Sequence, residues 1–286
     1  MDLKQWIGRT ESRADIVTAT PFAALSAALD HPAELPAPGQ VVHPAWHWLY
    51  FLPLARQSEI GVDGHPKRGG FLPPVELPRR MWAGSKLQFA QPLRVGDPIE
   101  RVSTIEDVSE KSGRSGTLVF VKVRHEVRRT GAPDAAILEF QDIVYREPAK
   151  PGDPVPAPTA APVSSTWSRT ITPDPVLLFR YSALTFNSHR IHYDRPYATG
   201  EEGYSGLVVH GPLIATLLLD LVRRSLPDAQ VLRFDFRAVR PLIDTHAFQV
   251  CGEPAAEAGA DGSRTIKLWA RDHEGWMTMD ATAVVR

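Results

Sequence analysis

Alternating apolar and polar positions recur along much of the chain and predict β-strands. In "GTLVFVKVRHEV" (116–127), Leu118, Phe120 and every second residue share one face, which is the period of a strand. Segments 86–105 and 231–250 each predict a strand, a proline-marked turn and a second strand, and segments 135–147, 264–272 and 276–285 add further strands. The pattern predicts an antiparallel sheet in each half of the chain.

One segment, "HGPLIATLLLDLVRRSLP" (210–227), has the period of a helix instead. Its helical spacing is carried by Leu213, Leu217, Leu218 and Leu221. Pro212 suits the first helical position, and Pro227 ends the helix. Because the segment is apolar on nearly all sides, we expect a buried helix. The matching region of the first half (43–61) is interrupted by Pro53 and is less regular.

A proline-rich stretch, "PAKPGDPVPAPTAAPV" (148–163), divides the chain almost in half and is typical of a semi-rigid linker. We therefore expect an N-terminal domain at 1–147 and a C-terminal domain at 164–286. The strand order of the two halves is similar, which favours a duplicated unit. Chance similarity between two antiparallel sheets is the alternative.

Composition excludes several classes of protein. The 286 residues carry a formal net charge of −1, which gives no reason to expect nucleic acid or an anionic membrane as partner. No apolar run approaches the ~20 residues of a membrane-spanning helix, and the N-terminus lacks the apolar core of a signal peptide. The single cysteine, Cys251, excludes an internal disulfide and favours a cytoplasmic location.

The candidate chemistry lies in "FRYSALTFNSHRIHYDRPYA" (179–198), where Asn187, His189, His192 and Asp194 lie close together. Imidazole, with an ordinary pKa near 6.5, can move protons in both directions near neutral pH. A simple turn decorated with polar residues is the alternative interpretation. The Cys–His spacings of zinc sites are absent, so no metal is predicted.

Two motifs together resemble the MaoC-like hydratase/dehydratase superfamily, and within it the type 2 hydroxyacyl-thioester dehydratase branch. They are "YSALTFNSHRIHYD" (181–194) and "GYSGLVVHGPL" (203–213). The resemblance implies an α+β double hot-dog fold, in which each of two antiparallel sheets wraps around a helix. It implies that the C-terminal hot-dog is catalytic, whereas the N-terminal one, with a degenerate helix, shapes the acyl pocket.

The motif departs from the wider family at the position of the catalytic base. Asn187 stands where that family has an aspartate, His189 replaces its asparagine, and Arg190 replaces its proline. An amide cannot act as a general base. We therefore expect His192 to be the principal acid/base, Asn187 to orient the water, and Asp194 or His189 to fix the imidazole tautomer.

The resemblance also implies how a thioester would be bound. The Gly211 N–H, at the start of the predicted helix, would stabilise the enolate-like oxygen. His210 precedes it, with a substrate-binding role or a structural one. Further candidates for substrate binding are Arg180 and Arg190, for a second carboxylate, and Arg237, Arg240, Arg79 and Arg80, for the phosphates of coenzyme A.

We therefore predict a hydratase that adds water across the double bond of an α,β-unsaturated acyl-CoA. The branch it resembles suggests a short dicarboxylic thioester, itaconyl-CoA or mesaconyl-C4-CoA, and so a role in itaconate degradation. Coenzyme A enters as part of the substrate, no other cofactor is expected, and a homodimer is allowed. Three alternatives stay open: a (3R)-hydroxyacyl-thioester dehydratase of fatty acid synthesis, a thioesterase, and a non-catalytic acyl-CoA-binding protein.

Overall fold

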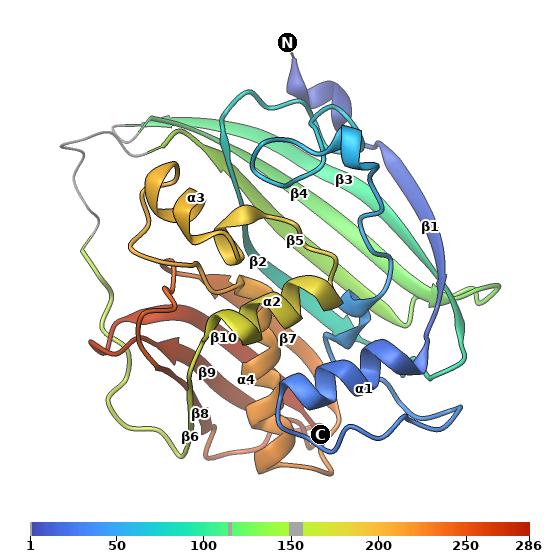
Figure 1. Ribbon diagram of the computed structural model, residues 1–286. Helices are drawn as coiled ribbons and strands as arrows, with labels where there is room; N and C mark the ends of the chain where they lie inside the picture. Colours follow the sequence, from blue (N-terminus) through green and yellow to red (C-terminus); the bar gives the residue numbers. More distant parts are fainter. Residues whose placement is uncertain (1, 114–115, 149–156) are drawn as a thin grey trace.

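Ten antiparallel strands form one continuous curved sheet in the order β1-β3-β4-β5-β2-β7-β10-β9-β8-β6 (Figure 1). The computed structural model describes residues 2–113, 116–148 and 157–286. The strands are β1 (Thr10–Ile16), β2 (Arg79–Phe89), β3 (Pro98–Gly113), β4 (Gly116–Arg129), β5 (Ile137–Arg146), β6 (Trp167–Ile171), β7 (Val231–Ala238), β8 (Phe248–Pro254), β9 (Arg264–Arg271) and β10 (Met277–Val285). The α-helices are α1 (Ala19–Ala28), α2 (Pro175–Leu184), α3 (Arg195–Gly200) and α4 (Gly211–Ser225).

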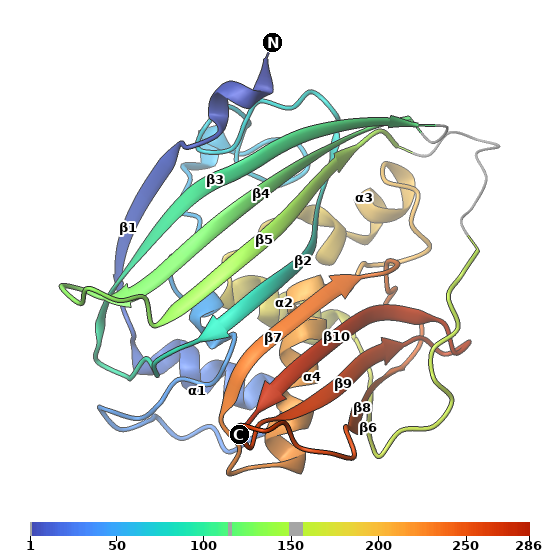
Figure 2. The same ribbon diagram turned by 180° about the vertical axis from the view of Figure 1, so that it is seen from behind.

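The C-terminal half is a sheet wrapped around the predicted long helix. Strands β7, β10, β9, β8 and β6 curve around α4, and every residue of α4 from Leu213 to Val222 is buried. Figure 2 shows this sheet from its outer side. The expectation of a helix that is apolar on nearly all sides, and therefore enclosed, is confirmed for α4.

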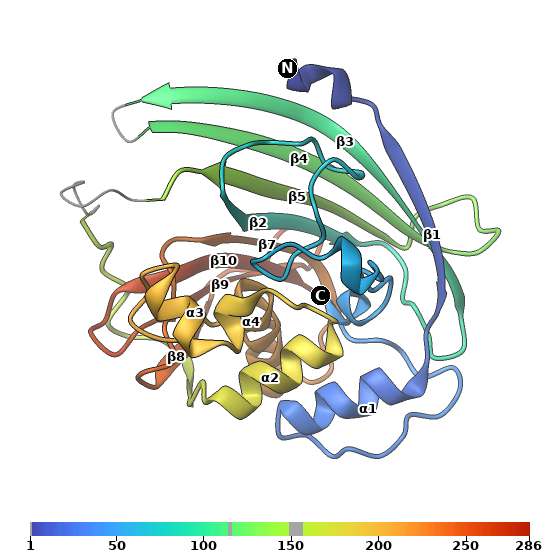
Figure 3. The same cartoon turned by 45° about the horizontal axis from the view of Figure 1, so that its top comes forward.

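The N-terminal half has an antiparallel sheet similar to that of the C-terminal half, but only a short 3₁₀ helix at the position that corresponds to α4. Where the sequence predicts a degenerate helix interrupted by Pro53, the chain forms a short 3₁₀ helix, η2 (Trp46–Leu49), ahead of that proline. The segment that follows η2 runs between the N-terminal sheet and helices α2 and α3 (Figure 3). Part of it, around Val75, packs on the inner face of the sheet against Val121 and Tyr145. The inner face of this hot-dog is therefore covered by a long loop.

The two halves are joined edge to edge rather than as separate sheets. Residues 84–88 of β2 pair with residues 233–237 of β7. A Cβ on Gly84 would lie 2.3 Å from the Phe236 carbonyl oxygen, so the two backbones can approach this closely only because position 84 is glycine. The junction is covered on its inner side by apolar residues of both halves.

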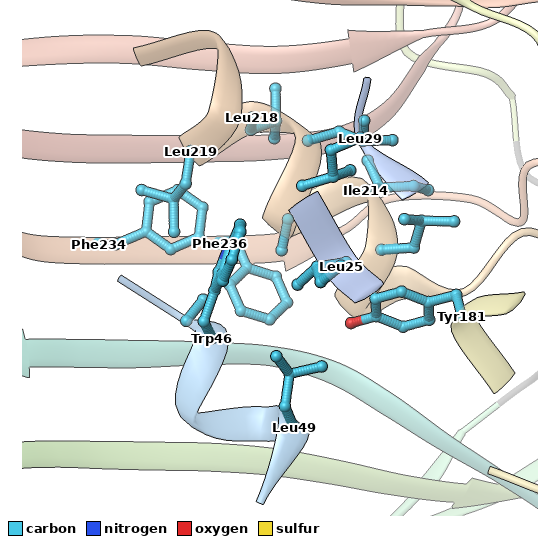
Figure 4. Close-up of a cluster of buried hydrophobic side chains, with 14 of the residues drawn as sticks. Leu25, Leu29, Trp46, Leu49, Tyr181, Ile214, Leu218, Leu219, Phe234 and Phe236 are labelled. Carbon is cyan, nitrogen blue, oxygen red and sulfur yellow. The ribbon is translucent and has the colours of Figure 1, made fainter. Parts of the chain in front are cut away.

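That apolar cluster unites the halves into one core (Figure 4). Leu25 of α1 and Trp46 of η2 come from the N-terminal half. Ile214 and Leu218 of α4, with Phe234 of β7, come from the C-terminal half, and all five are almost completely buried. Burying a large apolar side chain contributes ~1.5–3 kcal/mol, so a shared core of this kind holds the loops of one half firmly against the other.

The linker prediction is only partly visible in the structure. Strand β5 ends at Arg146 and β6 begins at Trp167, and in the described part of the intervening stretch Ala160 forms an isolated bridge with Trp276. Residues 149–156 of the predicted linker lie outside the described residues. None of the helices in the described part of the chain has the length and apolar character needed to cross a bilayer.

Candidate active site

The motif loop is shaped by its own side chains. Helix α2 ends at Leu184, and after it the Asn187 Oδ1 accepts a hydrogen bond from the His189 N–H at 3.0 Å. Asp194 caps α3, where its Oδ1 accepts from the Tyr197 N–H at 3.1 Å. Its other oxygen pairs with Arg190 at 2.7 Å. The Asn187 side-chain oxygen is therefore engaged in holding the turn.

His192 is buried and held in one tautomer. Its Nδ1 lies 2.7 Å from the Val208 carbonyl oxygen. Because a carbonyl only accepts, Nδ1 carries the proton and Nε2 presents a lone pair. Burial lowers the pKa of His192 to about 4, against a smaller opposing effect of this hydrogen bond, so the ring is neutral at pH 7. The Val208 carbonyl thus fixes the tautomer, which corrects the expectation that Asp194 or His189 does so.

His210 forms a stack with His192 at the start of α4. The ring centroids are 3.7 Å apart with 18° between the planes. The His210 Nε2 lies 2.8 Å from the Ser182 Oγ of α2, and Tyr181 meets the same ring edge-on at 5.1 Å. Burial, followed by the neighbouring His192, lowers the pKa of His210 well below its ordinary value. His210 therefore fixes the position of the His192 ring as a neutral partner.

Gly211 follows directly as the first residue of α4. The first N–H groups of a helix have no partner within the helix and carry its positive partial charge. A Cβ built on Gly211 meets no atom within 4 Å, so packing of the protein does not demand glycine here. The Gly211 N–H follows directly on His210, whose ring stacks on that of His192.

The N-terminal half contributes two residues to this cluster. Asp63 and His65 lie in a loop closed by the Ile60–Pro66 bridge, and the Asp63 Oδ2 is 2.9 Å from the His65 Nδ1. The His65 ring lies 4.0 Å from that of His189, which in turn lies 5.4 Å from that of His192. Four histidines and one carboxylate thus gather from both halves.

This loop is docked onto the motif through its backbone. The Arg190 N–H donates to the Asp63 carbonyl at 2.9 Å, and the Ser188 hydroxyl donates to the Gly64 carbonyl at 2.5 Å. Gly64 has a left-handed φ of 90°, and a Cβ there would lie 1.8 Å from the Ser188 carbonyl oxygen. Sequence reasoning missed this contact, because the "DGH" turn (63–65) lies more than 120 residues before the motif.

Most of the predicted arginines lie away from the histidines. Arg180 is exposed on α2, and Arg190 turns outward to Asp194 and to the Val62 carbonyl. Arg237 lies on the outer face of β7 near Asp280, opposite the inward Phe236, and Arg240 pairs with Asp272. Because strand residues alternate between faces, Arg237 lies on the face of β7 away from the histidines, and its predicted contact with the coenzyme A phosphates stays a prediction.

Comparisons with known proteins identify the family of the chain. The family model for hydroxyacyl-thioester dehydratase type 2 matches residues 45–244. A mesaconyl-C(4)-CoA hydratase of Chloroflexus aurantiacus is 48% identical over 284 residues, covering 98% of this chain and 97% of that protein. A mitochondrial hydroxyacyl-thioester dehydratase type 2 of Schizosaccharomyces pombe is 28% identical, covering 73% and 77%.

The chain belongs to the hydroxyacyl-thioester dehydratase type 2 family. A solved Mycobacterium tuberculosis protein described as a double hot-dog fold covers 98% of this chain and 96% of its own, with a TM-score of 0.61 and 15% identity. The predicted double hot-dog fold is thereby confirmed. The family match begins before Asp63 and ends after Gly211, so it includes both sides of the histidine cluster.

Within this family member, Asp63, His65 and His189 also offer three ligand atoms within 4.8 Å of one another. Two of these side chains already share a hydrogen bond. The set is therefore either a hydrogen-bonded acid–imidazole array or a candidate metal centre, and the two can be distinguished by experiment.

Proposed function

We propose that this protein hydrates the double bond of an α,β-unsaturated acyl-CoA, and is therefore a hydro-lyase. The observation that carries the proposal is the neutral His192, with Nε2 as acceptor, stacked on His210 at the N-terminus of α4. A base for water and a donor for an oxyanion are the two groups that this reaction needs.

The geometry suggests how each group acts. The His192 Nε2 takes a proton from water while the water oxygen bonds to Cβ of the substrate. The electron pair of the double bond moves to the thioester carbonyl, whose oxygen becomes an enolate near the Gly211 N–H. The imidazolium then returns its proton to Cα, which restores the neutral ring. The reverse sequence would dehydrate a 3-hydroxyacyl thioester with the same residues.

The acyl group that we propose is a short dicarboxylic one, mesaconyl-C4 or itaconyl. The relative at 48% identity is named for mesaconyl-C(4)-CoA, whose acyl group ends in a free carboxylate. Arg80 of β2 is the arginine we assign to that carboxylate. It lies opposite Tyr145 on β5, and its charge adds to the effect of burial in lowering the pKa of His65 and His189.

Arg80 also differs from its neighbour Arg79 in forming no ion pair within the described residues. Arg79 pairs with Glu202 at 3.2 Å, whereas no described carboxylate lies within 4.0 Å of the Arg80 guanidinium. Its side-chain partner is the Tyr145 hydroxyl, and a planar guanidinium without a carboxylate partner is suited to a bidentate carboxylate.

A substrate panel tests the proposal. We expect turnover of mesaconyl-C4-CoA or itaconyl-CoA to exceed that of crotonyl-CoA, which lacks the second carboxylate. Preference for crotonyl-CoA or longer monocarboxylic chains would reject the dicarboxylate assignment but retain hydration. No hydration of any enoyl-CoA would reject the enzyme itself and leave a binding protein.

The remaining parts of the proposal concern the setting of the reaction. We propose coenzyme A, as part of the substrate, as the sole non-protein group required, and a place in itaconate or mesaconate breakdown. A cytoplasmic location is supported by the single cysteine, and a homodimer is compatible with one chain already supplying both hot-dogs. Mass measurement in solution would test the dimer.

A further inference from the structure

We propose that Asp63 and His65, from the N-terminal half, form a carboxylate–imidazole pair in which the charge of Asp63 favours a proton on His189 of the motif, and His65 holds that carboxylate in place. They would replace the aspartate that is absent at position 187. This inference rests on the proposed hydration chemistry, and it assigns part of the acid–base apparatus to the half expected only to shape the acyl pocket.

The cluster needs a negative charge that the motif itself does not provide. During turnover His192 becomes an imidazolium in a buried site, next to neutral imidazoles, and an uncompensated buried cation is costly. Asp194, the acid of the motif, directs its carboxylate to Arg190 and the Tyr197 N–H. Its charge is therefore already matched by a cation.

The Asp63 carboxylate is hydrogen-bonded to His65, a member of the histidine cluster. Its Oδ2 is 2.9 Å from the His65 Nδ1, and its Oδ1 accepts the His65 backbone N–H at 3.0 Å. Burial would raise the pKa of Asp63, but the hydrogen bonds and charge of His65 outweigh it and hold that pKa well below its usual range. Asp63 is thus ionised at neutral pH and fixes His65 with Nδ1 protonated.

The charge of Asp63 acts on the next ring in the cluster. Burial first, and then the charges of His65 and His192, lower the pKa of His189 to about 2, and the charge of Asp63 opposes them. The rings of His65 and His189 are in contact at 4.0 Å with 37° between their planes. Such a contact transmits electrostatic support rather than a proton. Asp63 and His65 are therefore positioning residues, and the proton stays with the histidines of the motif.

The arrangement is held by backbone contacts and not by chance side-chain packing. The Asp63 carbonyl accepts from the Arg190 N–H, two residues before His192. The Gly64 carbonyl accepts from Ser188, one residue before His189. The turn bearing the carboxylate is thus fixed to the turn bearing the base, as an orienting acid in a catalytic triad must be.

The chain offers a matched control for this turn. Asp261-Gly262-Ser263 repeats Asp63-Gly64-His65, with the Asp261 Oδ1 accepting the Ser263 N–H at 3.0 Å and Gly262 at a left-handed φ of 77°. Asp261 is exposed in the connection between β8 and β9. Asp261→Asn therefore reproduces the loss of a turn-capping carboxylate without touching the histidines.

The test compares Asp63→Asn, His65→Gln and Asp261→Asn with the wild type, by kcat/KM for enoyl-CoA hydration across pH and by thermal unfolding. We expect Asp63→Asn and His65→Gln to lose at least ~10-fold in kcat, and Asp261→Asn to be unchanged. Loss of the negative charge lowers the proton affinity of the histidines. The acid limb of the Asp63→Asn profile should therefore move to lower pH, which a structural defect would not produce.

Three results would overturn the inference. The first is an Asp63→Asn enzyme that is as active as Asp261→Asn. The second is an activity reduced equally at every pH, with the acid limb unmoved. The third is a wild-type enzyme inactivated by a chelator and restored by Zn²⁺, which would make the Asp63–His65–His189 set a metal centre. An inactive wild type on every enoyl-CoA would instead refute the proposed function.

Discussion

Substitution of Gly211 by alanine should separate stability from activity. The added methyl meets no protein atom within 4 Å, and the backbone of Gly211 is not in the left-handed region. Alanine is preferred over glycine in helices by up to ~1 kcal/mol, so the free energy of unfolding should be unchanged or slightly increased. The same methyl would extend into space that no described atom occupies, next to the N–H to which we assign the thioester oxygen.

The expected loss of activity follows from the role of that N–H. Alanine keeps the N–H, but a methyl that holds the thioester oxygen away from it should cost about as much as loss of one oxyanion donor, ~10²–10³-fold in kcat, so Gly211→Ala should retain at most a few per cent of turnover. Gly200→Ala is the matched control, because Gly200 also lies in a helix, and a Cβ there also meets nothing within 4 Å. The assay is enoyl-CoA hydration together with thermal unfolding. A Gly211→Ala enzyme with the turnover of Gly200→Ala would refute the oxyanion assignment.

Two further predictions concern Arg80 and the buried histidines. Arg80→Gln should raise KM for mesaconyl-C4-CoA at least ~10-fold while leaving crotonyl-CoA nearly unaffected; equal effects on both substrates would contradict carboxylate recognition. His43 and His192 have pKa values lowered to about 4, mainly by burial, so unfolding takes up protons between pH 6.5 and 4. Stability is full above pH 6.5 and should fall by about 2 kcal/mol per histidine at pH 5, measured by denaturant unfolding; a stability that is flat over this range would contradict the neutral histidines.

The sequence predicted elements with a strong period and missed those without one. The strands from β2 to β5 and from β7 to β10, and helix α4, follow directly from spacing. Helices α1 and α2 were not predicted because their apolar residues do not gather on one face. Helix α1 packs on α2 and, through Leu25, joins the apolar cluster around α4. Strand β6 is only five residues long, Trp167–Ile171. For these elements tertiary packing outweighs local pattern.

The candidate site, like the fold, could be predicted from the sequence only in part. The sequence predicted that His192, His210 and Gly211 lie close together, because His192 is in the motif loop and His210 and Gly211 are at the start of the helix that follows it. Asp63 could not be placed there from sequence, because its position depends on the close approach of Gly64 to Ser188. The outward direction of Arg237 follows from strand alternation, once the inward side of β7 is known.

Turnover of mesaconyl-C4-CoA by His192→Ala, beside the wild type, tests the central claim most directly. We propose His192 as the neutral base, its tautomer is fixed by the Val208 carbonyl, and a general acid–base group contributes ~10²–10⁴-fold. We predict that the folded variant loses at least ~100-fold in turnover. A folded His192→Ala enzyme that keeps more than about a tenth of wild-type turnover would contradict the account.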